Sequence, residues 1–249
     1  LLEAIEVMQE GVQNLVVPIK NPFESLDSNN VHHNNNTTYN WLTQENMLHY
    51  IYSSIRRFCP TARNPINTLG VIETQNFFTV CYDDPASSIL DLLALSLISQ
   101  SSVAIVDPNG KFSGEISPVM LNSCDESIVP VIATLSVGEF ITYINCGGPP
   151  EDLAQLVKEK VEEQNLLGRR SKAIVCYPWD CLNVVMMQAL GHRMSYMWVV
   201  EEDGTLTGIV TFQRMLKVYR DDLISIHHDD DDAHNFYANI SAKCPFWLC

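Results

Sequence analysis

The chain is poor in basic residues. It has 15 Lys and Arg against 30 Asp and Glu, and its formal net charge is −15. A protein that binds nucleic acid or an anionic membrane surface needs clustered Lys and Arg to meet phosphate groups, so both kinds of partner are disfavoured. Apolar runs are short: the longest, residues 89–98, includes Asp91 and is about half the length of a membrane-spanning helix.

Catalytic signatures are equally scarce. The sequence contains no G-x-S-x-G, no H-E-x-x-H, no P-loop and no G-x-G-x-x-G after a strand, which argues against an enzyme. Its eight cysteines form no C-x-x-C pair, and several lie in apolar runs where a free thiol behaves as a small hydrophobe. A disulfide framework is the less favoured alternative. We therefore expect a soluble globular protein of a reducing compartment, the cytoplasm or the nucleus.

Possible metal ligands occur only in polar runs. His32 and His33 lie in the run NNVHHNNNTT, and residues 227–234 read HHDDDDAH. Either run could chelate a divalent ion, but adjacent histidines without a spaced carboxylate or Cys are more typical of a solvated loop, and a charge run of a solvated tail. We predict no metal site, and we expect residues 28–38 and 228–232 to be mobile.

The segment 197–215, MWVVEEDGTLTGIVTFQRM, organises the chain. Its two apolar runs are joined by a turn that closes on Gly204, which predicts a β-hairpin, and Thr211 stands where a helix N-cap is expected. The same pattern occurs 94 residues earlier without a gap. The earlier copy has Val106, Asp107, Gly110, Phe112, Ser113, Gly114, Ile116, Ser117 and Leu121. The later copy has, in the same order, Val200, Glu201, Gly204, Leu206, Thr207, Gly208, Val210, Thr211 and Met215. A constant register indicates an internal repeat.

A third, looser copy lies near the N-terminus. Residues 15–17 correspond to its first strand and residues 41–43 to the end of its second, with a polar insert at 21–40 between them. Its closing helix is predicted at 47–57. A helix with apolar spacing begins at Leu1, and the strand that should precede it is missing, so we expect the sequence to be a fragment of a longer chain.

Helical periodicity completes the two full copies. In the first, residues 77–82 predict a strand and residues 88–99 a helix with Leu92, Leu95, Leu93 and Leu97 towards the core. In the second, the buried face of the helix is predicted to be Leu182, Val185, Met186, Ala189 and Leu190. Between the copies, Ser136 is predicted to cap a helix through Ile144, and a second helix follows Pro149 and Pro150.

These patterns divide the chain into five predicted segments. They are a partial repeat at 1–58 with the insert 21–40, a repeat at 73–124, a helical connector at 125–171, a repeat at 172–222 and an acidic tail at 223–249.

Repeats of this form resemble cystathionine-β-synthase (CBS) domains. The arrangement is similar to plant multi-CBS proteins related to the γ subunit of the SNF1/AMP-activated kinases, and the resemblance is most specific at residues 208–211. It implies a mixed α/β (α+β) fold in which tandem strand-helix-strand-strand-helix repeats pair about a pseudo-twofold axis, as a Bateman-type module.

The resemblance also implies where a ligand would bind. In this family the clefts between paired sheets commonly hold adenine nucleotides. The residue at the position of Thr211 hydrogen-bonds the ligand, and an Asp three residues later binds both ribose hydroxyls. Ser117 and Thr43 match Thr211 in the other copies. The Asp position holds Arg214, Met120 and Asn46 in the three copies.

The phosphate-binding positions depart from the family pattern as well. The kinase γ subunits place a His-Arg pair at the entry to the strand, and the matching pairs are Ser195 and Tyr196, Ser101 and Ser102, and Gln13 and Asn14. The candidate ligand-binding residues are thus Thr211, Arg214, Ser117, Ser195 and Thr43, with AMP, ADP or ATP as the implied cofactor. The alternative is helix capping for Ser117 and Thr211, and an exposed helix cation for Arg214.

The implied function is regulatory. We expect a non-enzymatic regulatory or scaffold protein with degenerate adenine-nucleotide pockets, which modulates a protein partner such as a kinase complex or another CBS pair, a homodimer included. The alternative is an adenine-nucleotide energy sensor. Trp198, Phe212 and Trp247 are candidates for an exposed partner surface, although Trp198 lies in a predicted strand and also suits a core.

Overall fold

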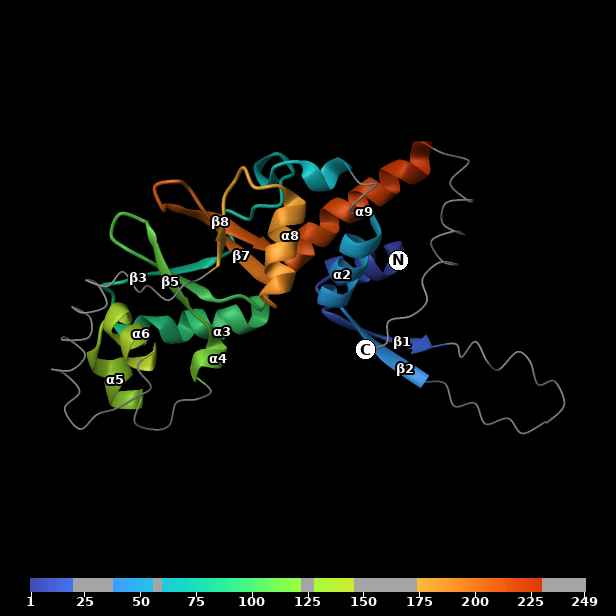
Figure 1. The fold of residues 1–249 in the computed structure, drawn as a ribbon. Helices are drawn as coiled ribbons and strands as arrows, with labels where there is room; N and C mark the ends of the chain where they lie inside the picture. The colour runs from blue at the N-terminus through green and yellow to red at the C-terminus, as the bar shows by residue number, and fades with distance from the viewer. Residues whose placement is uncertain (20–37, 56–59, 122–127, 146–173, 230–249) are drawn as a thin grey trace, which may run out of the picture. The chain divides into compact units, whose positions relative to one another are not determined.

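The computed structural model describes residues 1–19, 38–55, 60–121, 128–145 and 174–229 (Figure 1). It divides into two compact units, one formed by residues 1–63 and 212–249 and the other by residues 64–211. We call them the terminal unit and the central unit, and describe each by itself. Within the described ranges, no helix is both long and apolar enough to cross a bilayer.

The central unit contains two repeats of one design, the middle repeat and the last repeat. The elements of the middle repeat are β3 (Phe78–Cys81), α3 (Ile89–Ser99), β4 (Val103–Val106), β5 (Phe112–Ile116) and α4 (Pro118–Leu121). Those of the last repeat are β6 (Val175–Cys176), α8 (Leu182–Gly191), β7 (Tyr196–Val200) and β8 (Leu206–Thr211), and α9 (Phe212–Asp229) follows in the terminal unit. Each repeat makes a three-stranded sheet, β3-β4-β5 or β6-β7-β8, with a parallel crossover and then an antiparallel hairpin.

Short helices fill the rest of the central unit. They are η2 (Ile66–Thr68) and η3 (Ala86–Ser88), which are 3₁₀ helices, and the α-helices α5 (Ile128–Thr134) and α6 (Val137–Asn145). Ser136 and Glu139 form a capping box at the start of α6: the Ser136 N–H donates to the Glu139 carboxylate at 2.9 Å, and the Glu139 N–H donates to the Ser136 hydroxyl at 3.3 Å. The predicted cap at Ser136 is confirmed.

The two hairpins are equivalent in detail. Gly110 and Gly204 both lie in their turns with positive φ, 78° and 88°, a region that glycine enters without steric cost. The strand register shifts after Ile105 in one hairpin and after Val199 in the other, again 94 residues apart. The predicted pair of hairpins is confirmed.

The hairpins pair about a pseudo-twofold axis and lie side by side in Figure 1. The N–H of Phe112 donates to the carbonyl of Gly204 at 2.9 Å, and the N–H of Leu206 donates to the carbonyl of Gly110 at 3.1 Å. Each bond is the image of the other under a shift of 94 residues. This reciprocity confirms the predicted Bateman-type pairing.

The segments that lead into the two repeats are exchanged. Leu135, which precedes the last repeat in the chain, accepts from the N–H of Ala86 in the middle repeat at 2.9 Å. Asn64, which precedes the middle repeat, accepts from the N–H of Leu182 in the last repeat at 3.1 Å. Each repeat is therefore hydrogen-bonded to the segment that precedes the other repeat in the chain, which we call the lead-in of that other repeat. The two repeats thus form one unit.

The lead-in of the middle repeat continues along the edge of β8. Glu73 and Ile209 exchange both backbone hydrogen bonds, at 2.8 and 3.0 Å. A Cβ atom on Gly208 would stand 2.5 Å from the Glu73 carbonyl oxygen and 2.8 Å from Cγ2 of Ile72. Glycine at position 208 is thus required by a close backbone approach.

The apolar face of α8 matches the prediction in full, whereas that of α3 matches it only for Leu92 and Leu93. All five residues predicted for α8 are buried: Leu182, Val185, Met186, Ala189 and Leu190. In α3, Ile89, Leu93 and Ser96 are buried, while Leu95 and Leu97 are exposed, so their predicted core position is wrong. The buried residues recur at i, i+4 and i+7 on one face. Ser96 fits this face because its hydroxyl donates to the Leu93 carbonyl at 2.9 Å.

Described cysteines are free thiols. Cys81, Cys176 and Cys181 form no disulfide, as expected for small apolar residues. The Cys176 thiol lies 3.6 Å from the carbonyl oxygen of Trp198. Burial, and then the charge of Asp180, raises the pKa of Cys176 to about 12.

The terminal unit contains the partial repeat. Its elements are α1 (Leu2–Gln9), β1 (Asn14–Ile19), β2 (Thr38–Thr43), α2 (Gln44–Ile55), the 3₁₀ helix η1 (Pro60–Arg63) and α9. The strands β1 and β2 pair antiparallel, with Asn14 opposite Thr43 and Val16 opposite Trp41. The predicted strands are confirmed. The helix begins at Gln44 rather than at the predicted Met47, because a cap at Thr43 starts it earlier.

Helix α9 packs on α1 and α2 through one apolar face. Its buried residues are Phe212, Met215, Leu216, Tyr219 and Leu223. Phe212 is buried, so the prediction that it belongs to an exposed partner surface is wrong. Trp198 is buried as well, which confirms the core position that its place in a strand favoured. The helix continues to Asp229, past the predicted end of the repeat at Asp222.

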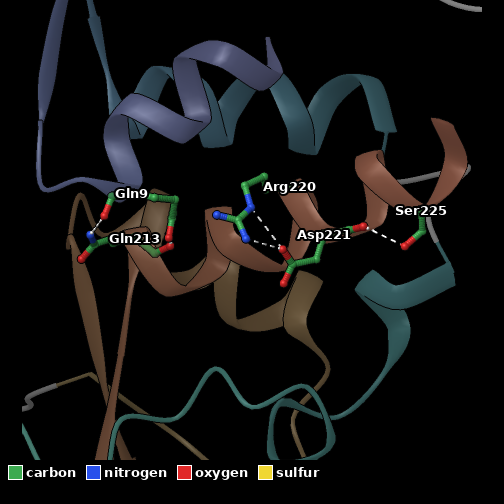
Figure 2. A network of polar contacts seen from close by, with 5 residues as sticks. All are labelled: Gln9, Gln213, Arg220, Asp221 and Ser225. Carbon is green, nitrogen blue, oxygen red and sulfur yellow. Dashed lines mark hydrogen bonds and ion pairs between the residues drawn. The ribbon is translucent and has the colours of Figure 1, made fainter. Parts of the chain in front are cut away.

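Polar contacts also hold α1 against α9. Figure 2 shows Gln9 and Gln213 in a reciprocal pair, in which each side-chain amide donates to the other residue's backbone carbonyl, at 2.8 and 2.9 Å. Further along α9, the Arg220 guanidinium donates twice to Asp221, at 2.9 and 3.1 Å. The second pair is partly exposed, and ion pairs at a protein surface contribute little to stability.

Several predictions fall outside the described residues. They concern the insert around His32, the helix after Pro150, the acidic tail beyond residue 229 and Trp247. At the edges of the segments predicted to be mobile, Thr38 belongs to β2, and residues 228 and 229 close α9.

The Gly208 contact makes a testable prediction. Replacing Gly208 by Ala should lower the free energy of unfolding by about 1–3 kcal/mol, because the new methyl group displaces the backbone of the lead-in. Urea denaturation measures the change. Gly191→Ala is the matched control: a Cβ at that site meets nothing within 4 Å among the described residues, so the change should stay within about 0.5 kcal/mol. Equal effects of the two substitutions would contradict the close approach.

Candidate functional site

The site predicted for phosphate lies where the two hairpins meet. Ser102 precedes β4, and Tyr196, its equivalent 94 residues later, begins β7. Both are buried, and their hydroxyl oxygens are 2.6 Å apart. The two equivalent residues therefore contact one another at the pseudo-twofold axis. In a perfect twofold pair they would be identical residues.

A carboxylate completes this contact. The Tyr196 hydroxyl donates to Oε2 of Glu115 at 2.9 Å, and the indole Nε1 of Trp198 donates to the same oxygen at 2.6 Å. A phenol has only one proton to donate, so the hydroxyl of Ser102 must be the donor to the Tyr196 oxygen. We call Ser102, Glu115, Tyr196 and Trp198 the axial network.

Aromatic rings surround the axial network. The ring of Trp198 lies 5.6 Å from that of Tyr196, 5.8 Å from that of Phe112 and 6.2 Å from that of Phe77, measured between centroids. The ring contacts with Phe77 and Tyr196 are edge-to-face, a favoured geometry for aromatic pairs. Ala104 and Ile209 complete this apolar cluster. The carboxylate of Glu115 is thus half-buried among apolar groups, and two donors are aimed at it.

The environment of the axial network is acidic. In the described part of the central unit, residues 64–121, 128–145 and 174–211, Lys111 and Arg193 are the only lysine and arginine. Burial, and then the charge of Glu115, raises the pKa of Tyr196 well above its ordinary value of 10.0. A phosphate group here would meet a carboxylate instead of the cations that normally bind it.

The predicted ligand-binding residues fall into four places. Thr211 ends β8 opposite Tyr196, so Thr211 and Ser195 lie at the same end of the last hairpin. Ser117 follows β5 at the equivalent end of the middle hairpin. Thr43 lies in the partial repeat, and Arg214 in the first turn of α9.

Two of these residues have a clear local role. The Thr43 hydroxyl accepts from the N–H of Asn46 at 3.0 Å, and the Asn46 side-chain oxygen accepts from the N–H of Thr43 at 3.1 Å. This reciprocal capping starts α2. The Ser195 hydroxyl is exposed and lies 3.4 Å from the carbonyl oxygen of Gln100.

Sequence reasoning did not select Glu115 or Trp198 as a functional pair. One signal was available: in the constant register, Glu115 takes the position of Ile209, so a carboxylate replaces an apolar side chain on an inward face. The described ranges contain no group of three His, Cys, Asp or Glu side chains that could hold a metal ion.

Comparisons with known proteins identify relatives. No protein-family model matches the chain. The CBS domain-containing protein CBSX5 of Arabidopsis thaliana is 34% identical to this chain in an alignment of 275 positions. The alignment covers 88% of this chain and 70% of that protein. The CBS domain-containing protein CBSX6 of the same plant is 23% identical in an alignment of 286 positions, which covers 87% of this chain and 66% of that protein. The chain thus spans roughly two thirds of the length of these relatives.

A solved structure shares the fold. The crystal structure of an uncharacterized conserved protein from Pyrococcus horikoshii matches with a TM-score of 0.54 and 17% sequence identity, over 87% of this chain and 74% of that one. At this identity the match concerns the fold alone.

The raised pKa of Tyr196 predicts a loss of stability in alkali. Above pH 10 the unfolded chain releases the phenolic proton while the folded protein keeps it, so the free energy of unfolding falls as the pH rises through that range. Below pH 10 the phenol is protonated in both states and contributes no slope. Tyr196→Phe should flatten the fall between pH 10 and 11, measured by urea denaturation at each pH. Tyr177→Phe, at a partly exposed site, is the control and should leave the slope unchanged; equal slopes for all three proteins would contradict the burial of the phenol.

Proposed function

Because the chain belongs to the family of CBS domain-containing proteins, we propose that it is a non-enzymatic regulatory protein that acts through a protein partner, such as a protein-kinase complex. The paired repeats provide a rigid body for such a role. We further propose that its adenine-nucleotide sites are degenerate, so that scaffolding, and not nucleotide sensing, is its main activity.

The axial network is the observation that carries this proposal. At the positions matching the phosphate-binding pair of the kinase γ subunits, Ser102 and Tyr196 bind one another, and Tyr196 also donates to Glu115. Their hydroxyl groups are engaged within the protein, and the nearest charge is negative. A nucleotide phosphate at this place would lose its hydration without gaining a cation. Electrostatics at the axis therefore oppose AMP, ADP and ATP.

The ribose position supports the same proposal. An Asp that accepts two ribose hydroxyls is replaced by Arg214 after Thr211, by Met120 after Ser117 and by Asn46 after Thr43. Asn46 is engaged in capping α2. Hydrogen bonds to a charged acceptor contribute about 1.5–3 kcal/mol each, so the loss of two corresponds to at least about a hundredfold in affinity.

The second candidate function is an adenine-nucleotide sensor. It is supported by the intact pairing of the hairpins and by Thr211, which keeps the position of the ligand-binding hydroxyl at the end of β8. Among adenosyl ligands, the cationic S-adenosylmethionine is the one whose charge Glu115 would not oppose. The measured affinity of the chain for adenine nucleotides decides between the two functions.

Calorimetric titration tests the proposal. AMP, ADP and ATP should show no binding at low micromolar concentration, and binding in that range would contradict the degenerate-pocket proposal. Arg214→Asp should restore the ribose acceptor while leaving Thr211 in place, and should raise the affinity for AMP by about a hundredfold if the rest of the site is intact. Arg214→Ala is the control, because it removes the same guanidinium without supplying a carboxylate. Equal affinities of the Asp and Ala variants would show that the ribose position does not determine affinity.

A further inference from the structure

The pairing surfaces of the middle and last repeats carry unlike side chains at equivalent positions. Ala104 lies opposite Glu115 across the middle hairpin, and Trp198 lies opposite Ile209 across the last hairpin. A shift of 94 residues takes Ala104 to Trp198 and Glu115 to Ile209. Where one repeat has a methyl group the other has an indole, and where one has a carboxylate the other has an alkyl group. The two surfaces are therefore different, although their strands are equivalent.

These differences complement one another across the axis. Ala104, Trp198 and Ile209 belong to one buried cluster, in which each of the three is at most 2% exposed. The indole of Trp198 donates to Glu115 at 2.6 Å, and the Tyr196 phenol donates to the same carboxylate. Both donors belong to the last repeat and the acceptor belongs to the middle repeat, so the contact has a direction.

Two copies of the last repeat would not fit one another about the same axis. Ile209 would then stand in place of Glu115, so the indole N–H of each Trp198 would be buried without its acceptor. The second indole would also have to occupy the space of the Ala104 methyl group in the cluster. An unpaired buried donor and an overpacked core are both destabilising.

Two copies of the middle repeat would fail for the opposite reasons. Each would bring Glu115 but neither the indole nor the phenol that donates to it, so two half-buried carboxylates would lie near the axis without these donors. Like charges repel one another, and burial penalises each of them. Ala104 in place of Trp198 would also leave a cavity in the apolar cluster, which lowers stability further.

We propose that Ala104, Glu115, Trp198 and Ile209 determine which repeats pair: each pairing surface fits the other repeat and rejects a second copy of itself. Similar repeats in one chain are prone to misassembly and domain swapping, and discrimination arises from groups that a wrong partner leaves unpaired. Pairing of like repeats from two molecules is thereby excluded, and the middle and last repeats form a fixed heterotypic pair.

Exchanging side chains across the pair tests the proposal on the whole chain. The carboxylate exchange is Glu115→Ile with Ile209→Glu, and the donor exchange combines Ala104→Trp, Trp198→Ala, Ser102→Tyr and Tyr196→Ser. Neither exchange changes the composition or the net charge of the protein. Each exchange alone separates the carboxylate from its donors, so each should raise the equilibrium constant of unfolding at least about thirtyfold, measured by urea denaturation.

Both exchanges in one chain should restore the pairing. The pseudo-twofold operation then brings the exchanged indole and phenol to the exchanged carboxylate, with the roles of the two repeats reversed. The equilibrium constant of unfolding should fall at least about tenfold below that of either exchange alone. A smaller recovery would overturn the proposal, because composition and net charge are the same in all four proteins.

A conservative cycle tests the same contact without large changes in volume. Glu115→Gln removes the charge of the acceptor, and Trp198→Phe removes the indole donor but keeps a ring. The effect of Glu115→Gln on the equilibrium constant of unfolding should be at least about threefold smaller in the Trp198→Phe protein than in the wild type. Equal effects in the two proteins would also overturn the proposal.

Disulfide trapping shows whether like repeats meet. Ser102 is buried beside the axis, so Ser102→Cys joins two molecules only where two middle repeats pair about that axis. After refolding from urea at high protein concentration and mild oxidation, this variant should give no more cross-linked dimer than the wild type with its native cysteines. Asn109→Cys, at an exposed turn position, is the control for thiol reactivity. A Ser102→Cys dimer above the wild-type level would contradict the exclusion of like repeats.

Discussion

The hydrogen bond between Ser102 and Tyr196 is the contact on which the central unit depends. It joins equivalent residues of two repeats at the pseudo-twofold axis, and it leaves the Tyr196 hydroxyl free to donate its proton in a hydrogen bond to Glu115. A buried polar network is stabilising only when each member has a partner, since an unpaired buried group costs about 1–3 kcal/mol. The indole of Trp198 gives Glu115 its second donor. The network thus joins the two hairpins at the axis.

The proposed function links structure and ligand preference through that network. Ser102 and Tyr196, which join the repeats, stand at the positions that the resemblance assigns to a phosphate-binding pair. Under this proposal a single substitution would not create a phosphate site without disturbing the pairing. The exchanged lead-ins also join the two repeats, because each repeat is hydrogen-bonded to the segment that precedes the other. Under the proposed function, these contacts hold the paired repeats as a binding module for a protein partner.

The sequence predicted the repeats well because their register of 94 residues is marked by turn glycines and strand residues with local roles. Gly110 and Gly204 have positive φ for reasons visible in a short segment. The apolar face of α3 was misjudged because Asp91 in its first turn is the single charged residue in the helix. In addition, Ser96 is buried although it is polar, because its hydroxyl donates to the Leu93 carbonyl. Glu115 was missed because its donors come from the other repeat, a contact that no local pattern records.

A double-mutant cycle on Ser102 and Tyr196 tests the central account most directly. Urea denaturation of Ser102→Ala, Tyr196→Phe and the double variant yields the coupling free energy between the two hydroxyl groups. The account predicts a coupling of about 1 kcal/mol, typical of a buried hydrogen bond between neutral groups. Additive effects, with a coupling below about 0.3 kcal/mol, would show that the two hydroxyl groups do not meet at the axis and would contradict the pairing on which the proposed function is built.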